Sequence, residues 1–245
     1  MTATIIAVVA VAMAVAFAQG VAGFGFALLA VPALAVLLPV KEAVVLSTII
    51  GAANSSYQAV LLRTSIDGVR VRRYLWGSLA GSPMGFAVFR LASPDVLRAV
   101  VGMAVLGGTV VVARVASGEG HRPVLDRSMA FVSGVLLTST STNGPPLVLA
   151  LRAQGVPTDV FRATLALVFA VTGVAASCAF AIAGSVDARV AALAAAALPA
   201  VAVGARLGFG CRDRVGGAAF SRLVIALLVA GALGSVAPFA ASVVG

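Results

Sequence analysis

The residues of this sequence that could bind a ligand are polar side chains and glycines that interrupt apolar segments. The run 138–143 reads Thr-Ser-Thr-Ser-Thr-Asn, lies inside a long apolar stretch and is followed by a glycine and two prolines. Hydroxyl and amide groups donate and accept hydrogen bonds, and a broken helix exposes N–H groups that attract anions. The candidate binding residues in this run are Ser139, Ser141, Thr142, Asn143 and Gly144.

A glycine-rich run, Gln-Gly-Val-Ala-Gly-Phe-Gly-Phe at 19–26, interrupts the first apolar stretch in a similar way. Glycine lets the main chain approach a ligand because no Cβ intervenes. We therefore expect Gly20, Gly23, Phe24 and Gly25 to contribute to the same site. The competing interpretation is close helix packing, since small residues are common where transmembrane helices touch.

Two further polar features have two interpretations each. Ser47, Gly51, Asn54 and Gln58 are spaced by four, three and four residues, so they share one face of a helix. Asn54 either faces a transport pathway or hydrogen-bonds a neighbouring helix, and we include it among the candidate binding residues. Arg162 lies either at a pathway mouth or at the membrane interface as an anchor.

The sequence offers little for metal, redox or covalent chemistry. Cys178 and Cys211 have no CxxC spacing, and His121 is the only histidine, so we predict no disulfide framework, metal site or cofactor. The eight Asp and Glu residues all lie in connections or at segment ends. An intramembrane enzyme would need a nucleophile with a base, or a metal. We therefore predict that the protein is not an enzyme.

The elements that must position these residues are membrane helices. Of the 245 residues 61% are hydrophobic and only 10% are charged, whereas soluble domains carry roughly 25% charged residues. Apolar stretches of about 20 residues, enough to cross the hydrocarbon core, recur along the chain. The net charge of +9 is spread over many short connections, as the positive-inside rule produces. This pattern predicts an all-α polytopic membrane protein that contacts lipid and binds no nucleic acid.

The apolar segments form two related halves. They lie at 3–39, 43–62, 74–92, 96–116, 129–151, 160–183, 188–210 and 219–243. Residues 117–128 form a linker between a first transmembrane repeat, 1–116, and a second, 129–245. Pro39 and Asp67 in the first repeat have counterparts in Pro157 and Asp187.

Each repeat is expected to begin with a broken helix and to continue with three transmembrane helices. A single helix over 3–39 would be roughly 55 Å long, far more than one crossing needs. The break forms either a re-entrant hairpin or two short arms. The basic loop at 63–73 has its equivalent one loop later in the second half, around 206–222. Such a shift predicts inverted repeats.

The same arginine bias gives the orientation, provided that each broken segment begins and ends on one face. It places the 63–73 loop in the cytoplasm and both termini on the external side. A cleaved signal peptide over Met1–Gln19 is an alternative, because Ala16-Phe17-Ala18 resembles a cleavage site. The missing positive n-region and the loss of one arm of a duplicated element argue against it.

These motifs together resemble those of the sulfite exporter TauE/SafE family. The resemblance rests on Gly20-Val-Ala-Gly-Phe-Gly-Phe, Val31-Pro32, Ile66-Asp67, Asn143-Gly-Pro-Pro-Leu and Phe161-Arg-Ala-Thr164. It spans essentially the whole chain. It implies transport of small sulfur-containing oxyanions such as sulfite, sulfonates or thiosulfate across the bacterial inner membrane.

The residues and the resemblance together predict a secondary transporter. The substrate would lie between the two interrupted helices, held by backbone N–H and Ser, Thr and Asn groups, while the two halves rock. The alternatives are a permease for a different small anion and a membrane-embedded subunit of a larger transport complex. The Gly- and Ala-rich helices are compatible with a monomer and with a homo-oligomer.

Overall fold

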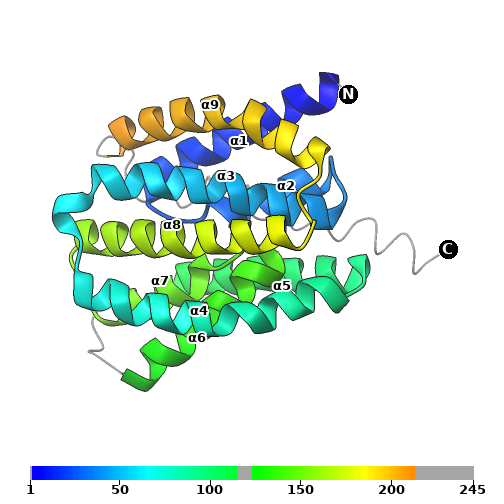
Figure 1. The fold of residues 1–245 in the computed structure, drawn as a ribbon. Helices are drawn as coiled ribbons and strands as arrows, with labels where there is room; N and C mark the ends of the chain where they lie inside the picture. The colour runs from blue at the N-terminus through cyan, green and yellow to red at the C-terminus, as the bar shows by residue number, and fades with distance from the viewer. Residues whose placement is uncertain (1, 115–122, 213–245) are drawn as a thin grey trace.

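The computed structural model describes residues 2–114 and 123–212, and in these ranges all regular structure is helical (Figure 1). The first half contains α1 (Thr2–Ala22), α2 (Phe26–Ala35), α3 (Val40–Leu61), the short 3-10 helix η1 (Arg63–Ser65), α4 (Gly68–Leu91) and α5 (Pro94–Arg114). The second half contains α6 (Pro123–Thr140), α7 (Gly144–Ala153), α8 (Thr158–Ile182) and α9 (Ala188–Cys211).

Four of these helices, α1, α3, α8 and α9, are long and apolar enough to cross a membrane, each with more than 20 residues. They are packed against other helices on one side and expose apolar side chains such as Ile6, Val174 and Ile182 on the other. Large exposed apolar side chains on long helices are what a lipid environment requires. The chain is therefore a multi-pass α-helical membrane protein.

The first apolar stretch divides into a long and a short helix. Gly23 (φ +83°) and Gly25 (φ +94°) adopt left-handed backbone conformations between α1 and α2, which residues with a Cβ rarely adopt. The helical hydrogen-bond pattern stops there, and α2 continues for only 10 residues.

The second half contains a similar break in the polar run 138–143, which separates the helices α6 and α7. Ser141 is left-handed (φ +63°) between α6 and α7. Pro145 and Pro146 occupy the first turn of α7, where proline does not remove a helical hydrogen bond. The short helix α7 again has 10 residues.

Polar contacts identify the two ends of the helix bundle. At one end, here called the Lys41 face, the Lys41 ammonium donates to the Arg90 carbonyl (3.4 Å) and the Arg90 guanidinium to the Ala183 carbonyl (3.3 Å). Arg189 at the start of α9 forms an ion pair with Glu42 (3.2 Å). This face therefore holds the starts of α3 and α9 and the ends of α4 and α8.

The opposite end, here called the Arg70 face, holds the starts of α4 and α6 and the end of α7. Arg70 donates to Gln154 (3.2 Å) and Arg73 to Asp126 (3.3 Å). Asp67 caps α4 by accepting from the Arg70 backbone N–H (3.0 Å). That hydrogen bond, together with the nearby Arg70 guanidinium, holds the pKa of Asp67 below its ordinary value.

The most extensive helix contacts join the first half to the second: α1 with α9, α4 with α6, and α3 with α8. The first two pairs run parallel and approach through glycine. A Cβ on Gly204 or Gly208 of α9 would overlap the carbonyl of Met13 or Phe17 of α1. The helices α3 and α8 run antiparallel through the centre (Figure 1).

The contact between α4 and α6 is built in the same way as that between α1 and α9. A Cβ on Gly81 would overlap the Phe131 carbonyl, and one on Gly85 the Val135 carbonyl. Gly134 of α6 in turn lies against the Ser78 carbonyl. Small residues at these positions let the two backbones touch, which is how transmembrane helices associate closely.

Some predicted boundaries differ from the structure. The helix α6 begins at Pro123, inside the predicted linker 117–128, so Asp126 is part of a helix rather than of a loop. The proline starts the helix because its missing N–H has no partner in a first turn anyway. The predicted last segment, 219–243, and His121 lie outside the described residues.

Candidate functional site

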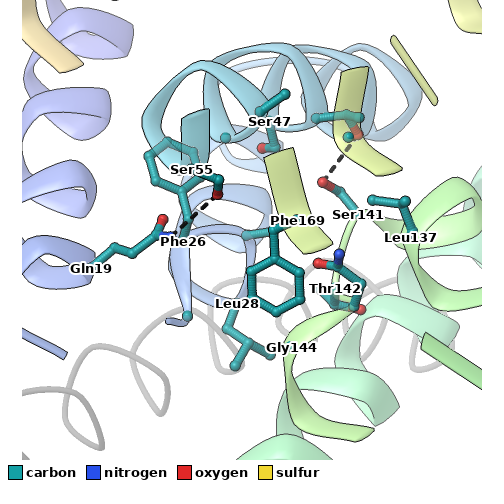
Figure 2. A pocket seen from close by; sticks show the side chains of 17 residues that line it. Gln19, Phe26, Leu28, Ser47, Ser55, Leu137, Ser141, Thr142, Gly144 and Phe169 are labelled. Atoms are coloured by element: carbon teal, nitrogen blue, oxygen red, sulfur yellow. Dashed lines mark hydrogen bonds between the residues drawn. The ribbon is translucent and has the colours of Figure 1, made fainter. Parts of the chain in front are cut away.

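A small cavity lies at the centre of the bundle, where both breaks meet the antiparallel pair α3 and α8. Its volume is about 40 Å³, room for roughly three water molecules. Figure 2 shows side chains from both halves of the chain around it. The polar or glycine residues that line it are Gln19, Gly25, Ser47, Thr48, Gly51, Ser55, Ser141, Thr142, Asn143, Gly144 and Gly173.

Two helical arms begin at this cavity. Phe26, Ala27 and Leu28, the first residues of α2, line it, and the first turn of a helix has N–H groups without intrahelical acceptors. Gly144, the first residue of α7, also lines the cavity. Each helix N-terminus carries a partial charge of roughly +0.5. Both positive helix ends therefore lie at one cavity.

Hydroxyl groups complete the walls. Thr48 Oγ1 of α3 and Ser141 Oγ form a hydrogen bond at the cavity (3.0 Å), which holds the left-handed residue in place. Ser47 Oγ is buried without a hydrogen-bond partner, and its side chain lies at the cavity (Figure 2). A buried hydroxyl without a partner is unusual and costly. It is therefore a group that a ligand could satisfy.

An amide network supports the wall formed by α1. Asn54 Nδ2 donates to Gln19 Oε1 (2.7 Å), and Gln19 Nε2 donates to Ser55 Oγ (3.4 Å). Gln19 and Ser55 line the cavity, whereas Asn54 does not. Of the two interpretations of Asn54, the structure thus favours a hydrogen bond to a neighbouring helix, through which Asn54 positions Gln19.

Some of the predicted site residues line the central cavity and others do not. Gly25, Ser141, Thr142, Asn143 and Gly144 line the cavity. Ser139 donates to the Val135 carbonyl of its own helix (2.7 Å) and does not line it. Gly20 lies within α1, where a Cβ would come within 2.9 Å of the Ala205 carbonyl of α9. That position matches the helix-packing interpretation of the glycines.

Sequence reasoning did not place Gln19, Ser47, Thr48 and Ser55 in the site. Gln19 was visible as the start of the interrupted run, and Ser47 as part of the polar face of α3. Nothing in the sequence singles out Thr48 and Ser55 as binding residues, because their proximity to the cavity depends on how α3 packs against α1 and α8.

A second, wider cavity of about 380 Å³ lies towards the Arg70 face. Phe24 and Phe161 line it with edge-to-face rings 6.2 Å apart, and Arg152 and Arg162 supply its charge. Arg162 also donates to the Val21 carbonyl at the end of α1 (3.1 Å). Its Cγ lies only 2.5 Å from the position that a Cβ on Gly23 would take. The interruption after α1 thus lines both cavities, with Gly25 at the central one and Phe24 at this one. Arg162 packs against it and donates to its Val21 carbonyl.

We expect Arg162→Gln to loosen this interruption. The substitution removes a charged donor to the Val21 carbonyl, an interaction worth about 1.5–3 kcal/mol. Amide hydrogen exchange at residues 21–25 should accelerate by roughly tenfold or more. Arg63→Gln, on the same face in η1, should leave exchange at 21–25 unchanged. Equal exchange in both variants would show that Arg162 does not hold the interruption.

A buried polar cluster fixes the far end of α7. The Asp126 carboxylate, 2% exposed, accepts from Arg73 (3.3 Å), the Tyr74 hydroxyl (3.3 Å) and the Gln154 amide (3.0 Å). Gln154 follows the last residue of α7. The cluster ties α7 to α4 and α6 and so holds the helix whose N-terminus faces the central cavity.

The cavity chemistry is that of neutral hydrogen bonding. None of the described residues that line the central cavity is charged. Within residues 2–114 and 123–212 there is no group of three or more His, Cys, Asp or Glu residues that could hold a metal ion. Backbone N–H groups, hydroxyls and amides around about 40 Å³ suit a small polar solute.

The family model described as sulfite exporter TauE/SafE matches residues 8–234, nearly the whole chain. The searches of curated proteins and of solved structures gave no significant match.

Proposed function

Because this chain belongs to the sulfite exporter TauE/SafE family, we propose that it is a secondary transporter of small sulfur-containing oxyanions across the bacterial inner membrane. One observation carries the binding mode: the N-termini of α2 and α7 begin at the same uncharged cavity, beside the unpartnered Ser47 hydroxyl. Helix N-termini attract anions because their N–H groups and dipoles point at the ligand.

The two halves are proposed to be inverted repeats. The parallel pair α1 and α9 joins the first helix of one half to the fourth of the other, and α4 with α6 makes the reciprocal pair. The hairpin of α1 and α2 leads back to the start of α3 on the Lys41 face. The hairpin of α6 and α7 begins and ends on the Arg70 face. Hairpins that enter from opposite faces are expected of inverted repeats.

The Arg70 face is proposed to be cytoplasmic. The described basic residues on the Lys41 face are Lys41, Arg90, Arg98 and Arg189, and those on or near the Arg70 face are Arg63, Arg70, Arg72, Arg73, Arg127, Arg152, Arg162, Arg206 and Arg212. Lysine and arginine accumulate on the cytoplasmic side of membrane proteins. The start of α1 then lies on the external side.

Alternating access is proposed to involve helix pairs that contain one helix from each half. Rocking residues 1–116 against 129–245 would separate the glycine contacts between α1 and α9 and between α4 and α6. Two backbones in direct contact make many dispersion contacts that such a motion would lose. The pair α1–α9 therefore moves against the pair α4–α6, on either side of the central cavity.

The proposal is tested by uptake into liposomes that contain only the purified protein. The panel is sulfite, thiosulfate, methanesulfonate, sulfate and chloride. One or more sulfur oxyanions should be selected over chloride. Asn143→Ala, which removes an amide at the cavity, should lower uptake of the selected anion by about 10- to 100-fold, as expected for one hydrogen bond to a charged group.

Ser56→Ala is the matched control, since Ser56 donates to the Ala52 carbonyl (2.8 Å) and does not line the cavity. Selection of chloride alone would favour a permease for a different small anion. A folded protein that transports none of the panel would favour a subunit of a larger complex.

A further inference from the structure

We infer that the central site carries anions with a single negative charge and discriminates against dianions of similar size. For sulfite the transported species is then hydrogensulfite. This inference rests on the proposed function and adds the charge state of the substrate to it. The features that carry it are the charge, the hydrogen-bond acceptors and the size of the cavity.

The positive potential of the site matches one negative charge. No described residue lining the cavity is charged, so the potential comes from the N-termini of α2 and α7. A complete helix N-terminus contributes roughly +0.5, and two prolines remove N–H groups from the start of α7, so the two helix ends together supply at most about +1. A dianion would leave a net negative charge in a buried, largely apolar space, and a buried charge without compensation is strongly unfavourable.

Attraction and desolvation depend differently on the charge of the ion, and this difference also favours a monoanion. Attraction to fixed dipoles grows in proportion to the charge of the ion. The desolvation penalty grows with its square, so a dianion loses about four times as much hydration as a monoanion of the same radius. Doubling the charge therefore doubles the attraction and quadruples the penalty. A cationic side chain in the cavity would offset that penalty, and the described lining contains none.

The cavity also offers acceptors to a protonated oxyanion. Ser47 Oγ is buried and without a partner, and a hydroxyl oxygen accepts as well as donates. A site built only of N–H donors has no acceptor for the O–H group of hydrogensulfite. The Ser47 hydroxyl oxygen can accept a hydrogen bond from that group. The Asn143 side chain brings a second group that can both donate and accept.

The second helical arm offers few N–H donors. Pro145 and Pro146 fill the positions where α7 would otherwise present two more N–H groups. Gly144 is the one residue of these three that keeps its N–H. A fully ionised dianion with several strong acceptor oxygens would lack donors on this side. The cavity of about 40 Å³ leaves no space for a hydration shell to replace them.

The experiment compares three anions in liposomes over pH 6.5–8.5 with the purified protein. Methanesulfonate is a monoanion and sulfate a dianion throughout this range, whereas hydrogensulfite loses its proton close to neutral pH. Sulfite uptake at constant total concentration should fall by about tenfold per pH unit on the alkaline side. Methanesulfonate uptake should stay constant, and sulfate should compete at least about tenfold more weakly. Protein-free liposomes give the background.

The variant Ser47→Ala separates the acceptor from the helix termini. It should reduce sulfite uptake more than methanesulfonate uptake, because only hydrogensulfite has a proton to donate. Ser56→Ala should change neither. Sulfite uptake that does not fall with pH, or sulfate that competes as well as methanesulfonate, would overturn the charge assignment while leaving anion transport intact. Absence of binding and transport of all three anions by folded protein would instead overturn the proposed function itself.

Discussion

Leucine in place of Gly144 should abolish transport while the protein remains folded. Gly144 is the first residue of α7 and lines the central cavity. A Cβ at this position would meet only the Phe169 ring, at 4.0 Å, so the backbone accepts a side chain. The remaining atoms of leucine would occupy the cavity of about 40 Å³. Transport should fall by at least about 100-fold, because substrate and side chain would need the same space.

Gly144→Ala gives the graded comparison. It adds only the Cβ, for which there is room, and should reduce uptake by less than about tenfold. Both variants should elute as single species and unfold near the parent's melting temperature in detergent. Normal uptake by folded Gly144→Leu protein would show that the anion does not pass through this cavity.

A large effect on stability is expected at Gly208 of α9. A side chain there would overlap the Phe17 carbonyl of α1 and force the two helix backbones apart. Overpacking of this kind destabilises by about 1–3 kcal/mol. For a protein of this size Gly208→Leu should lower the melting temperature in detergent by roughly 5–10 °C.

Gly210 provides the matched control, two residues further along the same helix. It is exposed, and a Cβ there would have no atom within 4 Å. Gly210→Leu should leave the melting temperature within about 2 °C of the parent's. Equal melting of the two variants would contradict the direct backbone contact between α1 and α9.

The sequence located the cavity through features that break a helix. Ser141, Asn143 and Gly144 stand next to a proline pair, and Gly25 stands among other glycines, so local chemistry alone predicts irregular backbone there. The resemblance of these motifs to the sulfite exporter family was confirmed by the family match over residues 8–234. The family and five of the residues that line the cavity were therefore predictable without coordinates.

Features that depend on distant partners were not accessible. Gly20 and Gly23 are both glycines in one run, but only Gly23 is left-handed, whereas Gly20 stays in α1 against α9. A glycine within a helix costs only about 1 kcal/mol, so the sequence does not show which of the two ends the helix. Thr48 reaches the site through Ser141, which lies 93 positions away.

The parallel contact between α1 and α9 has a consequence for how the chain acquires its structure during synthesis. Met13 and Gly204 meet in the folded protein but leave the ribosome about 190 residues apart, roughly 10–40 s at ordinary translation rates. Until then α1 has lipid, other helices or insertion factors as neighbours where α9 will lie. Chains truncated before α9 should therefore be early targets of membrane proteases, with an N-terminal helix that is inserted but unpartnered.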